Sequence, residues 1–229
     1  MTAPILYAAD VTPLADDALY SLAYAAASPA RREKADRYRF AKDRQLSLGA
    51  ETLLRHALCC AGLGTNSIDF DYGPGKKPYL KSGGVFFNLS HSEEWAICAV
   101  AECEVGCDVE QVAPIDLKLA RRFLPEEAED IYAQPTEAEK LDLFYRYWTL
   151  KESFMKATGL GLQLPLNAFR IVRGEKISVI QSVDDRDYSF REFSGLPGYK
   201  CALCCAGDCD GAQLRILDLK DILQREVKP

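Results

Sequence analysis

Two acidic residues separated by one position, Asp108 and Glu110, have a spacing that suits metal chemistry. They follow Val105-Gly106-Cys107, a small apolar run typical of a buried strand. Residues i and i+2 of a strand project from the same face, so we expect both carboxylates to point in one direction. Carboxylates on one face repel each other unless solvent or a cation separates them, and such oxygen ligands suit Mg2+. Two solvated acids at a strand end are the alternative for this motif taken alone.

Glu152 and Lys156 form a second pair, four residues apart. On a helix they share a face, and a surface ion pair worth roughly 0.3 kcal/mol would account for the spacing without any function. The apolar residues on the same turns instead favour a largely buried helix: Trp148, Leu150, Phe154 and Met155. Buried charges need partners or a function, which makes Glu152 a candidate metal ligand and Lys156 a candidate contact for a phosphate.

Polar and basic residues upstream could hold phosphate groups. Ser90-His91-Ser92 follows a strand-like segment, so we expect a turn whose hydroxyls, amides and imidazole can bind phosphate oxygens, although a structural histidine fits equally. Gly75-Lys76-Lys77-Pro78 is not a P-loop, because Lys77 occupies the position that needs serine or threonine. The basic residues around Lys42 form either a solvated helix face or a contact for a terminal phosphate.

The composition of the 229 residues is ordinary for a soluble enzyme, with 48% hydrophobic and 27% charged residues. The 28 basic and 34 acidic residues give a net charge of −6, which argues against a general binder of nucleic acid or membrane surfaces. No apolar run approaches the roughly 20 residues that span a bilayer, and no secretory signal is evident. We therefore expect a cytoplasmic protein, with any anion bound in a local basic pocket.

Nine cysteines, an odd number, are expected to be reduced thiols in such a compartment. A CxxC within residues 201–205 could bind zinc, but no second CxxC accompanies it. Residues 199–206 also alternate like a buried strand, in which free cysteine acts as a small hydrophobe. We therefore favour a buried strand here over a metal or redox site.

The pattern of elements is helix then strands, followed by helix then strands. Periodicity predicts helices at residues 30–63, 117–123 and 125–133, and one long helix or two at residues 137–158. A turn is expected at residues 72–78, and strands are expected at residues 85–88, 95–101, 103–109, 170–172, 177–180, 188–190 and 199–205. This order fits an α+β chain whose two halves, residues 1–103 and 104–229, pack as one unit.

Together these motifs resemble the Sfp-type 4′-phosphopantetheinyl transferase family. The matching segments occur in the family's order and spacing over about residues 30–205: Lys77-Pro78, Phe87-Asn88-Leu89-Ser90-His91-Ser92, Gly106-Cys107-Asp108-Val109-Glu110, and the region from Trp148 to Leu164. The resemblance implies transfer of 4′-phosphopantetheine from coenzyme A to a serine of an apo acyl or peptidyl carrier protein, with Mg2+ as cofactor and release of 3′,5′-ADP. It also implies a monomer of two similar α/β halves related by a pseudo-twofold axis, with the active site in the cleft between them.

The resemblance also implies roles for the chemical residues. Asp108, Glu110 and Glu152 would hold Mg2+ against the coenzyme A pyrophosphate. His91 would contact that pyrophosphate, and Lys156 would assist the departing phosphate. The base that deprotonates the incoming serine is either Glu152 or a metal-bound water that Glu152 orients.

The remaining positions carried over by the resemblance concern the nucleotide and the carrier. Ser90 belongs to the same pocket, and the positions near the 3′-phosphate and adenine are Lys42, Lys77 and Pro78. Carrier proteins are generally acidic, so Arg121 and Arg122 with Leu124 are candidates for docking them.

Two other functions use the same residues. A magnesium-dependent phosphodiesterase or pyrophosphatase would use water in place of the carrier serine. A non-enzymatic module that binds carriers or coenzyme A would be expected to lack a metal ligand, whereas all three acidic candidates are present.

Overall fold

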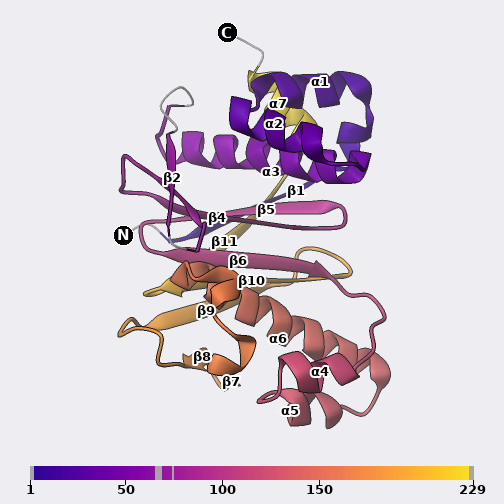
Figure 1. The fold of residues 1–229 in the computed structure, drawn as a ribbon, viewed down its shortest axis with the longest axis vertical. Helices are drawn as coiled ribbons and strands as arrows, with labels where there is room; N and C mark the ends of the chain where they lie inside the picture. The colour runs from indigo at the N-terminus through magenta and orange to yellow at the C-terminus, as the bar shows by residue number, and fades with distance from the viewer. Residues whose placement is uncertain (1–2, 65–68, 74, 227–229) are drawn as a thin grey trace.

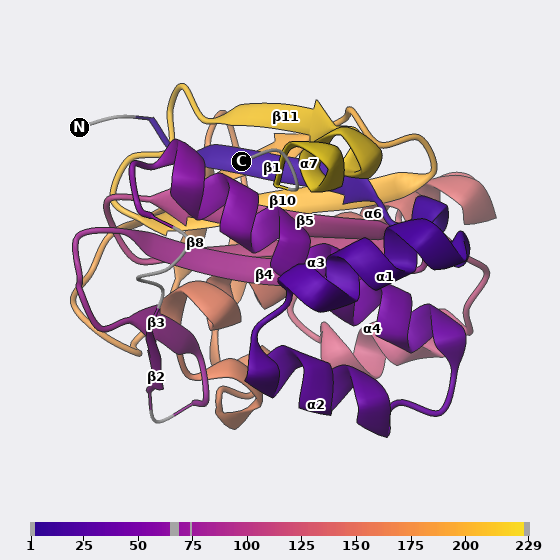
Figure 2. The same ribbon diagram turned by 90° about the horizontal axis from the view of Figure 1, so that it is seen from above.

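The computed structural model describes residues 3–64, 69–73 and 75–226. Two sheets pack against each other, and helices cover their outer faces, so the molecule is layered (Figures 1 and 2). This mixed α+β architecture agrees with the expected fold class. No helix in the described ranges is both long and apolar enough to cross a membrane.

The first sheet has the strand order β11-β1-β5-β4, in which only the β1–β11 pair is parallel. Its strands are β1 (Ile5–Asp10), β4 (Phe86–Ser92), β5 (Trp95–Ala101) and β11 (Gln213–Leu217). β1 is a central strand that the sequence pattern did not predict. Its residues from Leu6 to Ala9 are all buried, so they show no alternation between apolar and polar side chains.

The second sheet is antiparallel, with the order β6-β10-β9. Its strands are β6 (Val105–Gln111), β9 (Tyr188–Phe193) and β10 (Tyr199–Ala206), and two small hairpins lie outside both sheets: β2 (Phe70–Tyr72) with β3 (Pro78–Leu80), and β7 (Arg170–Arg173) with β8 (Ile177–Ile180). The turn expected at residues 72–78 connects the first hairpin, with its Pro74 outside the described residues.

The core between the sheets consists of alternate strand residues. The first sheet contributes residues such as Leu6 and Ile97, and the second contributes Val105, Cys107, Val109, Cys201, Leu203 and Cys205. Cys204 belongs instead to the core on the opposite face of the second sheet. Because Cys201 and Cys204 point to opposite faces, the CxxC does not form a metal site. The prediction of a buried strand is confirmed.

The outer face of the first sheet is covered by α1 (Asp17–Ala26), α3 (Ala41–Cys60) and the C-terminal α7 (Leu219–Glu226), and α2 (Pro29–Arg37) packs on α3 (Figure 2). The single helical region expected at residues 30–63 is thus two helices. Tyr38 and Phe40 are extended at the break, and the Arg44 guanidinium donates a hydrogen bond of 2.9 Å to the Tyr38 carbonyl.

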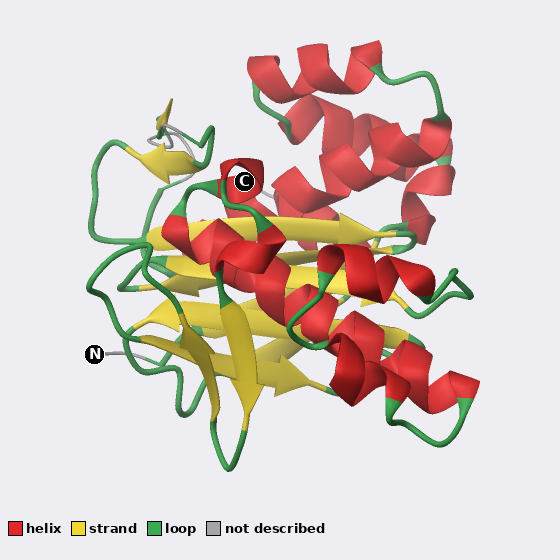
Figure 3. Ribbon diagram, turned by 60° about the horizontal axis from the view of Figure 1, so that its bottom comes forward, coloured by secondary structure: helices red, strands yellow, loops and turns green. Residues whose placement is uncertain are grey.

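The outer face of the second sheet is covered by α6 (Glu137–Thr158) (Figure 3). The segment predicted as one long helix or two is thus a single helix. A capping box between Thr136 and Glu139 begins the helix, and Gly159, with φ of 78°, ends it. The two helices before it are shorter than expected, namely α4 (Lys118–Phe123) and α5 (Ala128–Tyr132).

The end of the chain returns to the first sheet. β11 pairs with β1, and α7 packs on α3 and α1. The last strand and helix therefore pack on elements of residues 1–103, although the prediction assigned them to the second half. The C-terminal segment is therefore a strand followed by a helix, with residues 227–229 outside the described residues. The division into halves at residue 103 stays a prediction.

Candidate active site

The two sheets meet along β4 and β6, which lie side by side (Figure 1). Side chains connect these two edge strands. The Asn88 side-chain oxygen accepts a hydrogen bond of 2.9 Å from the Cys107 amide, and the Cys107 thiol donates one of 3.3 Å to the Asn88 carbonyl. The candidate residues of the two strands are therefore held in a fixed register.

Asp108, Ser90 and Lys156 form one cluster at this junction. The Ser90 hydroxyl donates to Asp108 Oδ1 at 2.8 Å, and Lys156 Nζ lies 2.7 Å from the same oxygen and 2.9 Å from Ser90 Oγ. Asp108 is buried, and its other oxygen, Oδ2, has no hydrogen-bond partner within the described residues. Lys156 pairs with Asp108, so the surface pair with Glu152 that its spacing suggested is wrong.

Glu110, like Asp108, accepts a hydrogen bond from a serine hydroxyl of β4. The Ser92 hydroxyl donates to Glu110 Oε2 at 2.8 Å and accepts a hydrogen bond of 3.2 Å from the Gln111 amide. Ser90 and Ser92 lie within strand β4, paired with Ile97 and Trp95 of β5. The turn expected at residues 90–92 therefore occurs at residues 93 and 94.

A close approach of α6 to β6 brings Lys156 to Asp108. A Cβ added to Gly106 would lie 2.0 Å from the Ser153 carbonyl oxygen and 2.4 Å from the Ala157 amide nitrogen. Only glycine fits at this distance, so Gly106 sets the spacing between helix and strand. The role of this glycine in the site was not apparent from the sequence.

The three acidic candidates influence one another. Burial, and then the negative charge of Asp108, raise the pKa of Glu110 and the pKa of Glu152. Burial alone would lower the pKa of Lys156, but Asp108, Cys107 and Glu152 together outweigh burial, so the pKa of Lys156 is raised. The ammonium is thus kept charged beside carboxylates that repel each other.

The donor set fits Mg2+ in its chemistry, because it consists of carboxylate oxygens and includes the buried, unpartnered Oδ2 of Asp108. Within the described ranges, however, no three acidic, histidine or cysteine side chains lie close enough together to hold a metal ion. Asp108 is turned towards Lys156 and Glu110 towards Ser92. At least one of the three carboxylates must therefore move before all of them can reach one cation. The contacts with Lys156 and the two serines engage only Oδ1 of Asp108 and Oε2 of Glu110.

A cationic cavity of about 230 Å3 lies beside β4. It is lined by residues that include Arg31, Lys34 and Lys76. Partial burial, followed by the charges of Lys156, Lys34 and Arg31, lowers the pKa of the exposed His91. The histidine therefore faces the same cations, and these groups together suit a ligand with several phosphates.

Arg31 and Lys34 were missed by sequence reasoning. They lie three residues apart on α2 and therefore share a face, which is a signal that the sequence offered. Glu51 orients Arg31 through an ion pair of 2.7 Å. Their proximity to His91 depends on how α2 packs, which spacing alone does not reveal.

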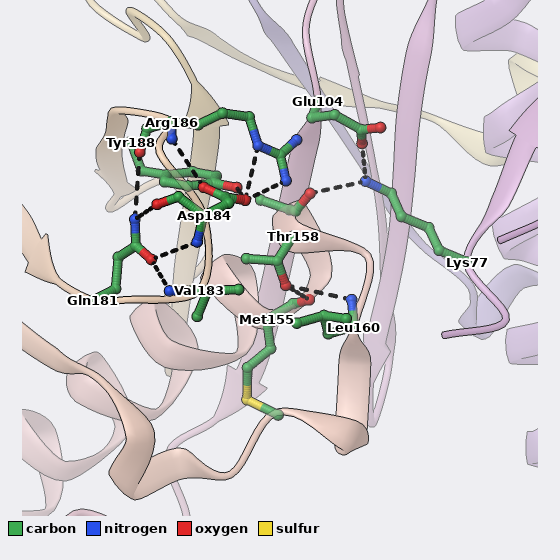
Figure 4. Close-up of polar contacts among 11 residues, drawn as sticks. Lys77, Glu104, Met155, Thr158, Leu160, Gln181, Val183, Asp184, Arg186 and Tyr188 are labelled. Carbon is green, nitrogen blue, oxygen red and sulfur yellow. Dashed lines mark hydrogen bonds and ion pairs between the residues drawn. The ribbon is translucent and has the colours of Figure 1, made fainter. Parts of the chain in front are cut away.

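Lys42 and Lys77 are engaged elsewhere. Lys42 forms an exposed ion pair with Glu93. Lys77 Nζ lies 2.6 Å from Glu104 and donates to the Val105 carbonyl at 3.0 Å (Figure 4). Neither lysine contacts the Ser90, Asp108 and Lys156 cluster directly in the described structure. Pro78 lines both the cationic cavity and a second cavity, of about 480 Å3, that Lys77 also lines.

The proposed docking residues differ in exposure. Arg121 and Arg122 are exposed, and Arg121 lies over the Tyr132 ring. Leu124 is fully buried in the core beneath α6, so its expected contact with a carrier is wrong. Its position after two arginines did not reveal that it faces inward.

Comparison with known proteins shows the family to which this chain belongs. A family model described as the 4′-phosphopantetheinyl transferase superfamily matches residues 104–204, and one described as 4′-phosphopantetheinyl transferase, N-terminal, matches residues 12–103. The chain is 34% identical over 198 residues to a 4′-phosphopantetheinyl transferase of Bacillus subtilis, covering 83% of this chain and 88% of the relative. It is 32% identical to 4′-phosphopantetheinyl transferase psf-1 of Bacillus pumilus, covering 85% of each chain. The resemblance in the motifs is thus confirmed, and the chain belongs to the 4′-phosphopantetheinyl transferase superfamily.

Proposed function

We propose that this protein transfers the 4′-phosphopantetheine moiety of coenzyme A to a serine of an apo acyl or peptidyl carrier protein and releases 3′,5′-ADP. The observation that supports placing this function at the site is the contact among Lys156, Asp108 and Ser90 where the two sheets meet. A charged amine, a hydroxyl and a buried carboxylate beside a cationic cavity suit displacement at a phosphodiester.

The cation site is proposed to consist of Asp108, Glu110 and Glu152. A bound Mg2+ supplies neutralisation of charge on the pyrophosphate oxygens of coenzyme A. Asp108 keeps one oxygen on Lys156 and Ser90, which leaves its buried Oδ2 as the oxygen available for a cation.

The other groups act on the reacting phosphate and on the carrier serine. Lys156 is oriented by Ser90 and Asp108 and remains charged, so it can stabilise the negative charge that develops on the departing 3′,5′-ADP. Glu152, or a metal-bound water that Glu152 would orient, is the candidate to deprotonate the serine hydroxyl. His91 donates to a pyrophosphate oxygen.

The nucleotide end of coenzyme A is proposed to occupy the cationic cavity. Arg31 and Lys34 supply positive charge for the 3′-phosphate. Pro78 and Lys77 would border the adenine, because Pro78 lies between the two cavities. Lys42 is a less favourable contact, because it would first have to leave Glu93.

The chain is further proposed to be a cytoplasmic monomer of two similar halves, divided near residue 103. Each half has a long helix, α3 or α6, that packs on an antiparallel strand pair, β4–β5 or β6–β10. The nine free cysteines fit a reducing compartment.

Mass spectrometry of candidate carriers tests the function. A carrier incubated with the protein, coenzyme A and Mg2+ is expected to gain the mass of phosphopantetheine on one serine. E152Q, which removes the proposed base with little change in shape, is expected to abolish this gain. If the folded protein releases 3′,5′-ADP at the same rate without any carrier, it is a hydrolase; if it binds carriers but leaves their mass unchanged, it is a binding module.

A further inference from the structure

A second serine of β4, outside the Ser90 cluster, contacts the other acidic residue of β6. We propose that Ser92 is a positioning residue that holds the Glu110 carboxylate in the orientation required for binding a divalent cation. The inference rests on the proposed function, because it assigns a role within the same site. Ser92 itself touches neither the reacting atoms nor the cation.

The two strands present matched pairs. Ser90 and Ser92 are two residues apart on β4, as are Asp108 and Glu110 on β6, so each hydroxyl meets one carboxylate. Both hydrogen bonds are 2.8 Å long. Each bond engages one carboxylate oxygen and leaves the second oxygen for another ligand.

The direction of the Ser92 hydroxyl is determined by its second contact. The Gln111 amide donates to Ser92 Oγ at 3.2 Å, so that oxygen already accepts a hydrogen bond. The hydroxyl has only one proton to donate, and this proton is directed to Glu110 Oε2. Ser92 thereby ties the carboxylate of Glu110 to the backbone of the next residue.

Glu110 needs such a restraint, because it is a partly buried carboxylate whose neighbour Asp108 is also negative. Without the hydroxyl, repulsion from Asp108 favours rotation of the side chain towards solvent. A cation would then have to reorder that side chain on binding, and the cost of ordering would weaken its affinity.

The turn after Ser92 is fixed as well. Glu93 has φ of 53°, a left-handed conformation that non-glycine residues rarely adopt, and Lys42 forms an ion pair with its side chain. This ion pair gives Lys42 a structural contact next to Ser92.

Titration with Mn2+ in the presence of coenzyme A, followed by electron paramagnetic resonance, measures the affinity of the full-length protein for a divalent cation. S92A is expected to lower the affinity for Mn2+ about ten-fold, as the loss of a hydrogen-bond partner of a metal ligand commonly does. S92T keeps the hydroxyl and is expected to restore most of the affinity. S21A, which removes an exposed hydroxyl on α1, is the matched control and is expected to have no effect.

A double-mutant cycle separates positioning from general stability. If Ser92 acts through Glu110, S92A added to E110Q changes Mn2+ affinity by less than about two-fold. If Ser92 had a merely structural role, S92A would instead lower the thermal midpoint and would lower the affinity for Mn2+ equally in wild type and in E110Q. That result overturns the proposal. Equal Mn2+ affinity in S92A and wild type overturns it too. Neither result affects the proposed function, which fails only if wild-type protein leaves carriers unmodified.

Discussion

Asp108 and Lys156 form an ion pair across the close contact between β6 and α6, with 2.7 Å between Oδ1 and Nζ. The Asp108 side chain is 4% exposed and that of Lys156 is 24% exposed. The carboxylate is therefore inside the protein, whereas part of the lysine side chain is exposed. The Lys156 ammonium donates to Asp108 Oδ1, Ser90 Oγ and the Cys107 carbonyl, so one of these three bonds must give way when it contacts a phosphate. This arrangement lets one lysine compensate a buried charge and contact a phosphate.

Replacing Lys156 should therefore affect both stability and turnover. K156M leaves the Asp108 charge buried without its partner and is expected to lower the free energy of unfolding by about 2 kcal/mol, less than for a fully buried pair. Loss of the positive charge at the departing phosphate is expected to lower kcat about 100-fold. Urea unfolding and carrier modification rates measure the two effects.

The double variant D108N/K156M distinguishes these effects. With neither charge present, much of the lost stability should return, while the transfer rate stays low. Recovery of the rate together with stability would show that Lys156 acts only on folding.

Gly106 is a second position where packing controls the site. G106A places a Cβ 2.0 Å from the Ser153 carbonyl oxygen, so α6 must move away from β6. We expect destabilisation of about 2 kcal/mol and slower transfer, because Lys156 moves relative to Asp108. Thermal unfolding and the transfer rate are the measurements.

The matched control for this change is G64A. A Cβ on Gly64 would meet no atom of the described residues within 4 Å, so neither stability nor transfer should decline. Wild-type stability in G106A would contradict the close contact.

Local signals made part of this structure predictable. The ends of α6 follow from the acidic first turn after Thr136 and from Gly159, and β10 follows from its alternating apolar residues. Ser90 to Ser92 were expected in a turn because their polarity concealed a strand, and their pairing with Asp108 and Glu110 depends on a strand 18 residues away in sequence. The cavity position of Arg31 likewise depends on how α2 packs on α3, which has no local signature.

The cysteines should react with alkylating reagents according to burial. Cys59 and Cys60 are exposed, whereas burial raises the pKa of Cys107 to about 12 and raises the pKa of Cys201 and Cys204 well above the usual thiol value. The thiolate is the reactive form, so brief labelling of the native protein near pH 8 should modify Cys59 and Cys60 first. Peptide mass spectrometry gives the order of labelling. Full labelling in urea is the control, and early labelling of Cys204 in the native protein would contradict the buried strand.

Binding of coenzyme A should depend on pH through His91. Partial burial and then the nearby cations lower its pKa below the usual value near 6.5, so the imidazole of the free protein is mostly neutral at pH 7. An anionic phosphate beside the ring favours the protonated form, and binding should therefore be accompanied by proton uptake. Affinity is expected to increase as pH falls towards the lowered pKa and to lose this contribution above it.

Calorimetry in two buffers of different ionisation enthalpy counts the protons taken up when coenzyme A binds. Metal is left out, so that protons displaced from the carboxylates by a cation do not enter the count. H91Q keeps a hydrogen-bond donor but cannot titrate, and the phosphates of coenzyme A titrate in both proteins. The difference between wild type and H91Q therefore isolates the histidine, and it should be a net uptake that grows as the pH is lowered from 7 to 6. An identical proton count in the two proteins would mean that His91 does not face the bound phosphates.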